Sequence, residues 1–439
     1  MRERPYLIDP RGPVQAALVK AGTRVIPILF ILYFVNFLDR VNVSFAALQM
    51  NGDLGFTPAV YGLGASMFFL GYFFFEVPSN WVAARVGARA WLVRITVSWG
   101  IIACLMALVK NPTAFYVLRL LLGVAEAGFV PALLLYTAAW FPQAERANAV
   151  ARLWSSTAFA LILGGPFSAL LLTLGGPLRG WQWMFLCEGV PAIALGFVLM
   201  RVLPASPATA AWLTEPERTA LTAALAHDDA AARVHGVADF RLALVRPLMW
   251  GYAVTYLFLG VGFFGITFWL PQIVKQLSGL NAIDTSLLTA VPYIFAAAAM
   301  LIVGSRRRAP EELRRIFVTG CLIGAAGVCA SALTANPWLS LTALTIGAMG
   351  IWSVVAIIWA SASWRLAGTG AAAGLALINA IGGLGGFAGP YMIGLVKGAT
   401  GSFTLALFII AAALVVCGAL AFGVMRLPAQ RITGAEVPA

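Results

Sequence analysis

The feature of this sequence that most constrains its fold is a series of long apolar runs, each containing at most two charged residues. The runs occupy residues 25–48, 61–84, 91–109, 114–141, 148–174, 183–203, 247–274, 285–305, 314–333, 338–364, 371–396 and 402–425. Each is close to the ~20 residues that a membrane-spanning helix needs. Strands of a membrane barrel would alternate polar and apolar residues instead. The sequence therefore predicts an all-α integral membrane protein with twelve transmembrane helices.

Composition supports a membrane location, since hydrophobic residues make up 61% of the 439 and charged residues only 10%. The net charge of +12 is spread over short loops between apolar runs, a distribution that orients a membrane protein. We therefore expect the lipid bilayer as a partner, and no nucleic acid.

The basic residues also predict the orientation. Of the 29 lysines and arginines, Arg40 and Arg119 lie deep inside apolar runs, and the others lie in loops or near the ends of runs. Alternate loops hold only four more, Lys110, Arg179, Lys275 and Lys397. The remainder lie on the side of residue 1, so the positive-inside rule predicts that both termini are cytoplasmic. No signal peptide is recognisable, and we expect a multi-pass protein of the cell (inner) membrane.

One long polar stretch, residues 204–246, divides the chain into two halves of six spans. We expect an amino-terminal six-helix bundle over 1–203, a cytoplasmic linker over 204–246 and a carboxy-terminal bundle over 247–439. Within the linker, Thr214 and Glu217 have capping-box spacing and predict a short surface helix. His227, Asp228, Asp229 and His235 in the same stretch are interpreted as a solvated charge cluster.

Several function classes find no support in the sequence. The five cysteines lie in apolar runs without ligand spacing, so they predict neither a disulfide nor a metal site. There is no Walker motif and no nucleophile, metal cluster or polar catalytic loop, so we expect no catalytic residues, no enzyme activity and no cofactor beyond a coupling proton. A carrier driven by an ion gradient, working as a monomer, is the expected class.

An ionised group near the bilayer centre costs about 3 kcal/mol or more, so charges inside spans point to function. All the candidates lie in the first half: Asp39, Arg40, Glu76, Arg119, Glu126 and Glu188. Two arginines facing one cavity suit a carboxylate, because a guanidinium donates paired hydrogen bonds to both oxygens. Alternatively, Arg40 pairs with Asp39 or Glu126 for structural reasons.

Glu126 and Asp39 can change charge, and a carboxyl near an arginine can bind and release protons. We interpret Glu126 as a coupling site. Asp39 is either a coupling site or a group that positions Arg40. Glu76 and Glu188 lie beside helix-distorting prolines, and for these the structural reading is favoured.

In the second half, Asn379 either contacts substrate or hydrogen-bonds a neighbouring helix. Trp352 and Trp359 share one helix face and can stack on a ligand ring, although packing is the more common role.

Six segments together resemble one known family. They are NFLDRVN at 36–42, FEVPSN with RVGAR at 75–89, RLLLGVAEAG at 119–128, GWQW at 180–183, FWLPQ at 268–272 and ALIN at 376–379. The chain resembles the anion:cation symporters of the major facilitator superfamily over nearly its whole length. The resemblance implies two six-helix bundles, alternating access and import of organic anions with protons. It associates Arg40 and Arg119 with the substrate's negative charge, and Asp39 and Glu126 with proton coupling.

Departures from the family pattern bear on the substrate. Phe37 and Phe264 stand where relatives often carry tyrosine, and Gly383 where tartrate-type relatives often carry asparagine. Residues 304–310 replace a longer loop that usually contains aspartate. We expect a more apolar pocket that suits an aromatic or alkyl carboxylate.

The sequence therefore predicts a proton-coupled importer of a small organic anion. Arg40, Arg119, Asn379, Trp359, Phe37 and Phe264 are the predicted substrate-binding residues. The alternatives are a sugar-acid (aldonate or tartrate) symporter, a drug/proton antiporter and a transporter-like sensor. An antiporter is disfavoured because the span 5 pattern typical of that class is absent around Gly165.

Overall fold

The computed structural model describes residues 12–233, 246–304, 309–368, 371–426 and 430–432. The first half comprises α1 (Pro13–Arg24), α2 (Ile26–Leu54), α3 (Pro58–Val86), α4 (Ala88–Met106), α5 (Pro112–Glu126), α6 (Phe129–Ala138), α7 (Gln143–Leu172) and α8 (Gly180–Val202). The linker contains the 3₁₀ turn η2 (Pro207–Thr209) and α9 (Glu215–Arg233). The second half comprises α11 (Pro247–Ser278), α12 (Ala282–Gly304), α13 (Pro310–Leu333), α14 (Pro337–Arg365), α15 (Ala371–Thr400) and α16 (Thr404–Val424).

Twelve membrane-spanning helices are present in the described part of the chain, which confirms the predicted fold class. Several begin with a proline in the first turn, where its missing N–H is not needed. At α3 and α5 the preceding residue adds a side-chain cap: Thr57 accepts from the Val60 amide at 3.3 Å and Asn111 from the Ala114 amide at 2.9 Å. The loops between spans are therefore short and sharply defined.

Two short strands were not predicted. β1 (Leu366–Gly368) follows α14, β2 (Gln430–Ile432) follows α16, and the two pair in parallel.

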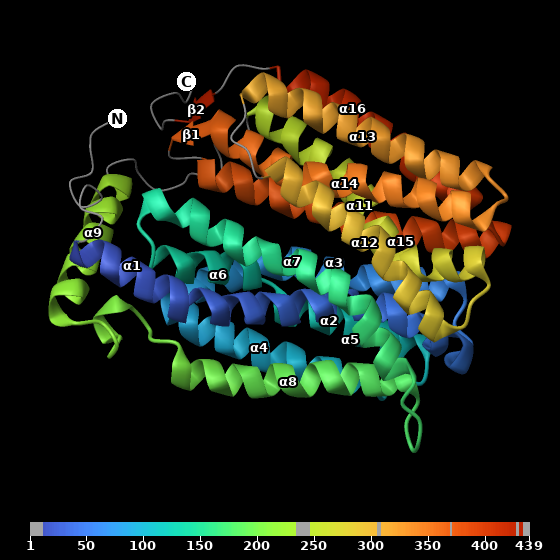
Figure 1. Ribbon diagram of the computed structural model, residues 1–439, viewed down its shortest axis with the longest axis horizontal. Coiled ribbons are helices and arrows are strands. Elements are labelled where there is room, and N and C mark those ends of the chain that lie inside the picture. Colours follow the sequence, from blue (N-terminus) through green and yellow to red (C-terminus); the bar gives the residue numbers. More distant parts are fainter. Residues whose placement is uncertain (1–11, 234–245, 305–308, 369–370, 427–429, 433–439) are drawn as a thin grey trace.

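The helices lie in two groups, with α1–α8 in one and α11–α16 in the other (Figure 1). Helices α3 and α15 pack against each other across the boundary between the groups. Glycines make this approach possible, because a Cβ at Gly62 would lie 2.8 Å from the Pro390 carbonyl oxygen. A Cβ at Gly386 would lie 2.4 Å from the Phe69 ring. The seam is thus built from small residues on one helix facing backbone or aromatic rings on the other.

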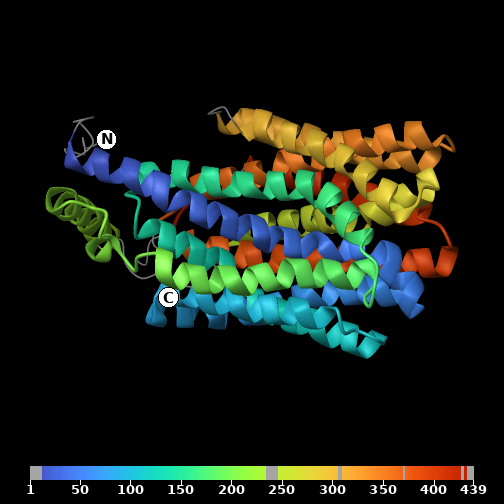
Figure 2. The same ribbon diagram turned by 60° about the horizontal axis from the view of Figure 1, so that its bottom comes forward.

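Helix α9 lies beside α1 at one end of the molecule (Figures 1 and 2), which we call the terminal end. Lys20 of α1 forms a 2.8 Å ion pair with Glu217 of α9. The Thr214 amide donates to the Glu217 carboxylate at 2.9 Å, and the surface helix predicted after Thr214 is confirmed as α9.

At the opposite end, which we call the remote end, hydrogen bonds join the two groups. The Tyr61 hydroxyl donates to the Phe268 carbonyl oxygen at 2.7 Å. Lys275 donates to the Leu48 carbonyl oxygen at 3.0 Å, and the Asn51 amide donates to Gln272 at 3.3 Å. The two groups of helices are therefore in direct contact at the remote end.

Candidate functional site

A buried ion pair joins α2 and α5 in the first half. Arg40 Nη2 lies 2.8 Å from Glu126 Oε2, and the two side chains are 12% and 0% exposed. The Asn36 amide donates to the same oxygen at 3.0 Å. Of the two partners considered for Arg40, the structure therefore pairs it with Glu126 on a separate helix.

A helix break positions Glu126. The span predicted at 114–141 crosses once but consists of two helices, with α5 ending at Glu126 and α6 starting at Phe129. Gly128 between them has φ of +82°, and a Cβ there would lie 2.3 Å from Ser79 Oγ. The carbonyl groups freed by the break are bonded, since Ser79 Oγ donates to Ala127 O at 2.5 Å and Arg94 to Ala125 O at 3.0 Å. Discontinuous helices of this kind recur at the binding sites of membrane carriers.

Arg119 is fully buried on α5, seven residues before Glu126, and so lies on the same helix face about two turns from the ion pair. Its Nη2 donates to the Ala65 carbonyl oxygen at 3.2 Å, while Nε and Nη1 have no hydrogen-bond partner among the described residues. The Phe68 ring lies close to both arginines, with its centroid 5.0 Å from Arg40 Cζ and 5.2 Å from Arg119 Cζ. Two guanidinium groups around one ring, with donors to spare, are suited to holding an anion.

A second polar cluster joins α2 to α8. Asn42 Nδ2 donates to Glu188 Oε2 at 2.6 Å and to Asp39 Oδ1 at 3.3 Å. Asp39, Asn42 and Glu188 are each at most 3% exposed. The sequence favours a structural role for Glu188 near a span end, and its link to Asp39 through Asn42 is not visible there.

Aromatic side chains of the second half reach the arginines through α3. Phe264 lies with its ring centroid 4.5 Å from that of Phe69, and Phe69 lies 5.2 Å from Phe68. Trp359 is half-buried and packs edge-on against Tyr256 at 5.1 Å. Phe37, by contrast, is 8% exposed and belongs to the packed core.

Trp352, which shares a helix face with Trp359, is buried against Phe263 at 4.6 Å and Tyr293 at 5.8 Å. This environment is that of a packing residue.

Asn379 hydrogen-bonds across the boundary between the two helix groups. Its Nδ2 donates to Glu76 Oε1 at 2.5 Å, joining α15 to α3. Of the two roles considered for Asn379, the bond to a neighbouring helix is the one this conformation displays. Substrate contact by Asn379 stays a prediction.

Gly383 faces open space on the same helix. A Cβ added there would meet no atom within 4 Å, whereas one at the adjacent Gly382 would lie 1.8 Å from the Tyr256 ring. The position where tartrate-type relatives often carry asparagine therefore has room for a larger side chain.

The linker residues considered as ligands have other surroundings. Asp228 accepts a 2.7 Å hydrogen bond from the Gln143 amide at the start of α7. His235, the Asp229 side chain and the basic loop at 305–308 lie outside the described residues. In the described part of the chain, no group of three or more His, Cys, Asp or Glu residues is placed to hold a metal ion.

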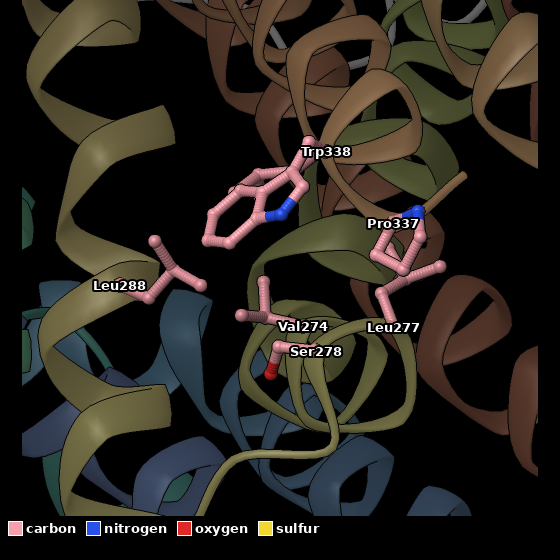
Figure 3. A pocket seen from close by; sticks show the side chains of 7 residues that line it. Val274, Leu277, Ser278, Leu288, Pro337 and Trp338 are labelled. Carbon is pink, nitrogen blue, oxygen red and sulfur yellow. The ribbon is translucent and has the colours of Figure 1, made fainter.

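A small apolar pocket elsewhere does not contribute to this site. It lies where the ends of α11 and α14 meet α12 at the remote end, and Figure 3 shows Trp338 and Leu288 facing each other above Val274 and Ser278. None of its seven lining residues is charged. The arginines and carboxyl groups on α2, α5 and α8 are the stronger candidate.

Comparison with known proteins agrees with the helix arrangement. The family model described as Major Facilitator Superfamily matches residues 29–390. The chain belongs to this superfamily. A "Putative tartrate transporter" of Agrobacterium vitis is 43% identical over 411 residues, covering 92% of this chain and 90% of the relative. A "Quinolone resistance transporter" of Acinetobacter baumannii is 38% identical over 397 residues, covering 88% and 89%.

A solved structure shares the fold. A bacterial homologue of the human lysosomal transporter Spinster, in an inward-facing and occupied conformation, superposes with a TM-score of 0.74 at 15% identity, covering 92% of this chain and 97% of that one. The relatives are named as transporters, and this agrees with the class that the sequence predicts for this chain. Their names are also consistent with the predicted resemblance to permeases of the anion:cation symporter type.

Proposed function

We propose that this protein imports a small organic carboxylate together with protons, by alternating access across the cell (inner) membrane, with both termini in the cytoplasm. The observation that carries the proposal is the pair of buried arginines around Phe68, where Nε of Arg40 and Nε and Nη1 of Arg119 have no partner among the described residues. Buried donors of this kind are costly unless an acceptor joins them. A substrate carboxylate supplies two acceptor oxygens and one negative charge.

The bond from Arg40 to Glu126 supports coupling to protons. Arg40 Nη2 is held by Glu126 Oε2 at 2.8 Å, so Glu126 and a substrate anion compete for the same guanidinium. A proton on Glu126 removes that competition and compensates the charge of the incoming anion. Release of the proton would restore the ion pair and expel the anion, with Asp39 beside Arg40 assisting. The remote end would then be the outer side, closed in this conformation.

The body of the substrate is expected to be aromatic or hydroxylated. Phe264 reaches the arginines through Phe69 and Phe68, and Trp359 with Tyr256 adds a second aromatic surface. These rings favour a carboxylate with an apolar body. A hydroxy or sugar acid is the alternative, and the name of the tartrate relative favours it. We expect the carrier to work as a monomer.

Uptake into proteoliposomes tests the proposal. With a proton gradient acidic outside, we expect accumulation of labelled benzoate or L-tartrate above equilibrium. Glu126→Gln is expected to abolish accumulation while sparing exchange between internal and external substrate. Uphill uptake that is unchanged in Glu126→Gln contradicts the coupling role, and proton-driven export of a quinolone without carboxylate uptake would favour the antiporter alternative.

A further inference from the structure

One amide group bridges two acidic side chains in the first half. Asn42 Nδ2 lies 2.6 Å from Glu188 Oε2 and 3.3 Å from Asp39 Oδ1. All three side chains are essentially inaccessible to solvent, at 2%, 3% and 1% exposed. The two carboxyl groups therefore form a cluster of their own, next to the Arg40–Glu126 ion pair but bonded through a different side chain.

Neither carboxyl group of this cluster has a cationic partner. Among the described residues, no lysine, arginine or histidine nitrogen lies within the 4.0 Å of an ion pair with Asp39 or Glu188. Arg40 is engaged by Glu126. Arg119 donates to the Ala65 carbonyl. Both arginines and Glu126 act on Asp39 electrostatically, but from beyond contact distance.

The helices packed around Glu188 supply no other charge to it. Helix α2 presents Asp39 and Asn42. Helix α4 presents Cys104, close to Gly189, the residue after Glu188. The arginines of α4 are bonded elsewhere, Arg89 to the Met200 carbonyl oxygen and Arg94 to the Ala125 carbonyl oxygen. The charged residues of α7, at 145, 146 and 152, lie in its first ten residues at the terminal end. Cys187 precedes Glu188 on its own helix.

Two ionised carboxylates in this position would repel each other in a medium of low dielectric, with one amide between them. Three buried acceptor oxygens of the cluster also have no hydrogen-bond donor among the described residues. They are Asp39 Oδ2, Glu188 Oε1 and Asn42 Oδ1. A proton on either carboxyl removes one charge and gives the cluster the missing donor. We propose that Asp39, Asn42 and Glu188 form a proton-binding site, separate from the Arg40–Glu126 pair, that holds a proton in the substrate-free protein.

This inference deepens the proposed function, and its transport part rests on that function. Asp39 directly precedes Arg40 on α2, so an anion bound by Arg40 would change the electrostatic potential at the cluster. Glu188 thereby becomes a third carboxyl group of the proton-coupling machinery, on a helix that carries none of the other candidates. Its proton would leave through Asp39 to the side on which the site is open.

Infrared spectroscopy of the substrate-free protein tests proton binding without any transport. We expect a protonated-carboxyl C=O band at neutral pH that is lost or strongly reduced in both Glu188→Gln and Asp39→Asn. Glutamine at 188 still accepts from Asn42, so the packing is preserved. The matched control is Glu126→Gln, which removes a carboxylate paired with Arg40 and is expected to leave this band in place. Wild-type protein without such a band, or a band unchanged in both Glu188→Gln and Asp39→Asn, would overturn the site.

Transport assays then test its role. If wild-type proteoliposomes accumulate L-tartrate or benzoate with protons, Glu188→Gln is expected to reduce accumulation at least tenfold while substrate exchange persists. Accumulation equal to wild type would show that the site is not part of coupling. If the wild type shows no proton-driven uptake at all, the proposed function fails, and the infrared result still decides whether the proton-binding site exists.

Discussion

Asn379 on α15 donates a 2.5 Å hydrogen bond to Glu76 on α3, and so connects helices from opposite halves of the chain. Along the same seam, Gly394 meets Gly62 and Gly386 meets Phe69. These contacts recur about every seven residues, two helical turns, on both helices. Glu76 and Asn379 are the polar members of an otherwise apolar seam, on its terminal side.

This contact is expected to stabilise the conformation seen here, in which the remote end is closed. A net hydrogen bond of about 1 kcal/mol changes a two-state equilibrium about fivefold. Glu76→Leu should therefore shift the population toward the conformation in which the remote end is open. Glu76→Gln retains an acceptor for Asn379, so its population should stay close to that of wild type. Double electron–electron resonance measures the shift as a change in the distance distribution between spin labels at residues 90 and 311, which are exposed at the terminal ends of α4 and α13. Equal distance distributions in Glu76→Leu and wild type would contradict the prediction.

Gly383 offers a test of substrate selection. Because a Cβ there meets no atom within 4 Å, Gly383→Asn is expected to fold with unchanged thermal stability. It adds an amide to an aromatic surface, so uptake should shift toward L-tartrate relative to benzoate. The ratio of initial uptake rates for the two acids measures this.

The neighbouring Gly382 provides the matched control for that experiment. A Cβ at Gly382 would lie 1.8 Å from the Tyr256 ring, so Gly382→Asn should lower stability and the uptake of both acids together. A selectivity change of the same size in both variants would argue against a specific role for Gly383.

Arg119 is expected to need its planar guanidinium as well as its charge. Lysine retains the charge but not the fork of donors that contacts both carboxylate oxygens. Arg119→Lys is expected to lose one charge-assisted hydrogen bond to the substrate, which is about 1.5–3 kcal/mol. The Kd for benzoate or L-tartrate should therefore rise by roughly one to two orders of magnitude. Calorimetric titration of the purified protein measures it. Arg179→Lys, on an exposed side chain, is the control, and equal affinities in the two variants would remove Arg119 from the site.

The charged residues of the site were predictable because a charge inside a membrane is expensive wherever the helix is rotated. The residues to which they bond were harder to predict from the sequence. Arg40 and Glu126 are 86 positions apart in sequence, and only the rotation of α2 against α5 decides whether Arg40 pairs with Glu126 or with Asp39. Glu188 was undervalued for the same reason, because its nearness to Pro191 is visible in the sequence and its contact with Asn42 is not. The break after Glu126 was missed because glycine is common in membrane helices and only its φ identifies it.

The contact between α1 and α9 is expected to depend on pH. The hydrogen bond from Lys20, followed by that from the Thr214 amide, holds the pKa of Glu217 below its usual value. Because the pKa of Glu217 is lower in the folded than in the unfolded protein, its ionised carboxylate stabilises the folded contact at pH values above the unfolded pKa of about 4.3. That stabilisation is lost as the pH falls through the pKa of the folded protein. Protection of the α9 amides from hydrogen exchange, corrected for the intrinsic rate at each pH, should therefore fall in acid, and it should already be low at neutral pH in Glu217→Gln. Wild-type protection that persists in that variant at neutral pH would contradict the role of the ion pair.

Gly128 is expected to be the most sensitive glycine at the helix break. Its φ of +82° disfavours any other residue, and a Cβ would lie 2.3 Å from Ser79 Oγ, the atom that donates to the Ala127 carbonyl. Gly128→Ala should therefore lose more than the about 1–2 kcal/mol that left-handed backbone costs a residue with a Cβ. Gly55→Ala isolates the backbone term, since Gly55 has φ of +65° and no atom within 4 Å of its Cβ position. Thermal unfolding should show a larger loss for Gly128→Ala than for Gly55→Ala, and the Ser79→Ala/Gly128→Ala double variant should recover part of the difference. Because the break orients Glu126 toward Arg40, Gly128→Ala should also impair proton-driven uptake, and equal stability and transport in the two single variants would show that the break does not position Glu126.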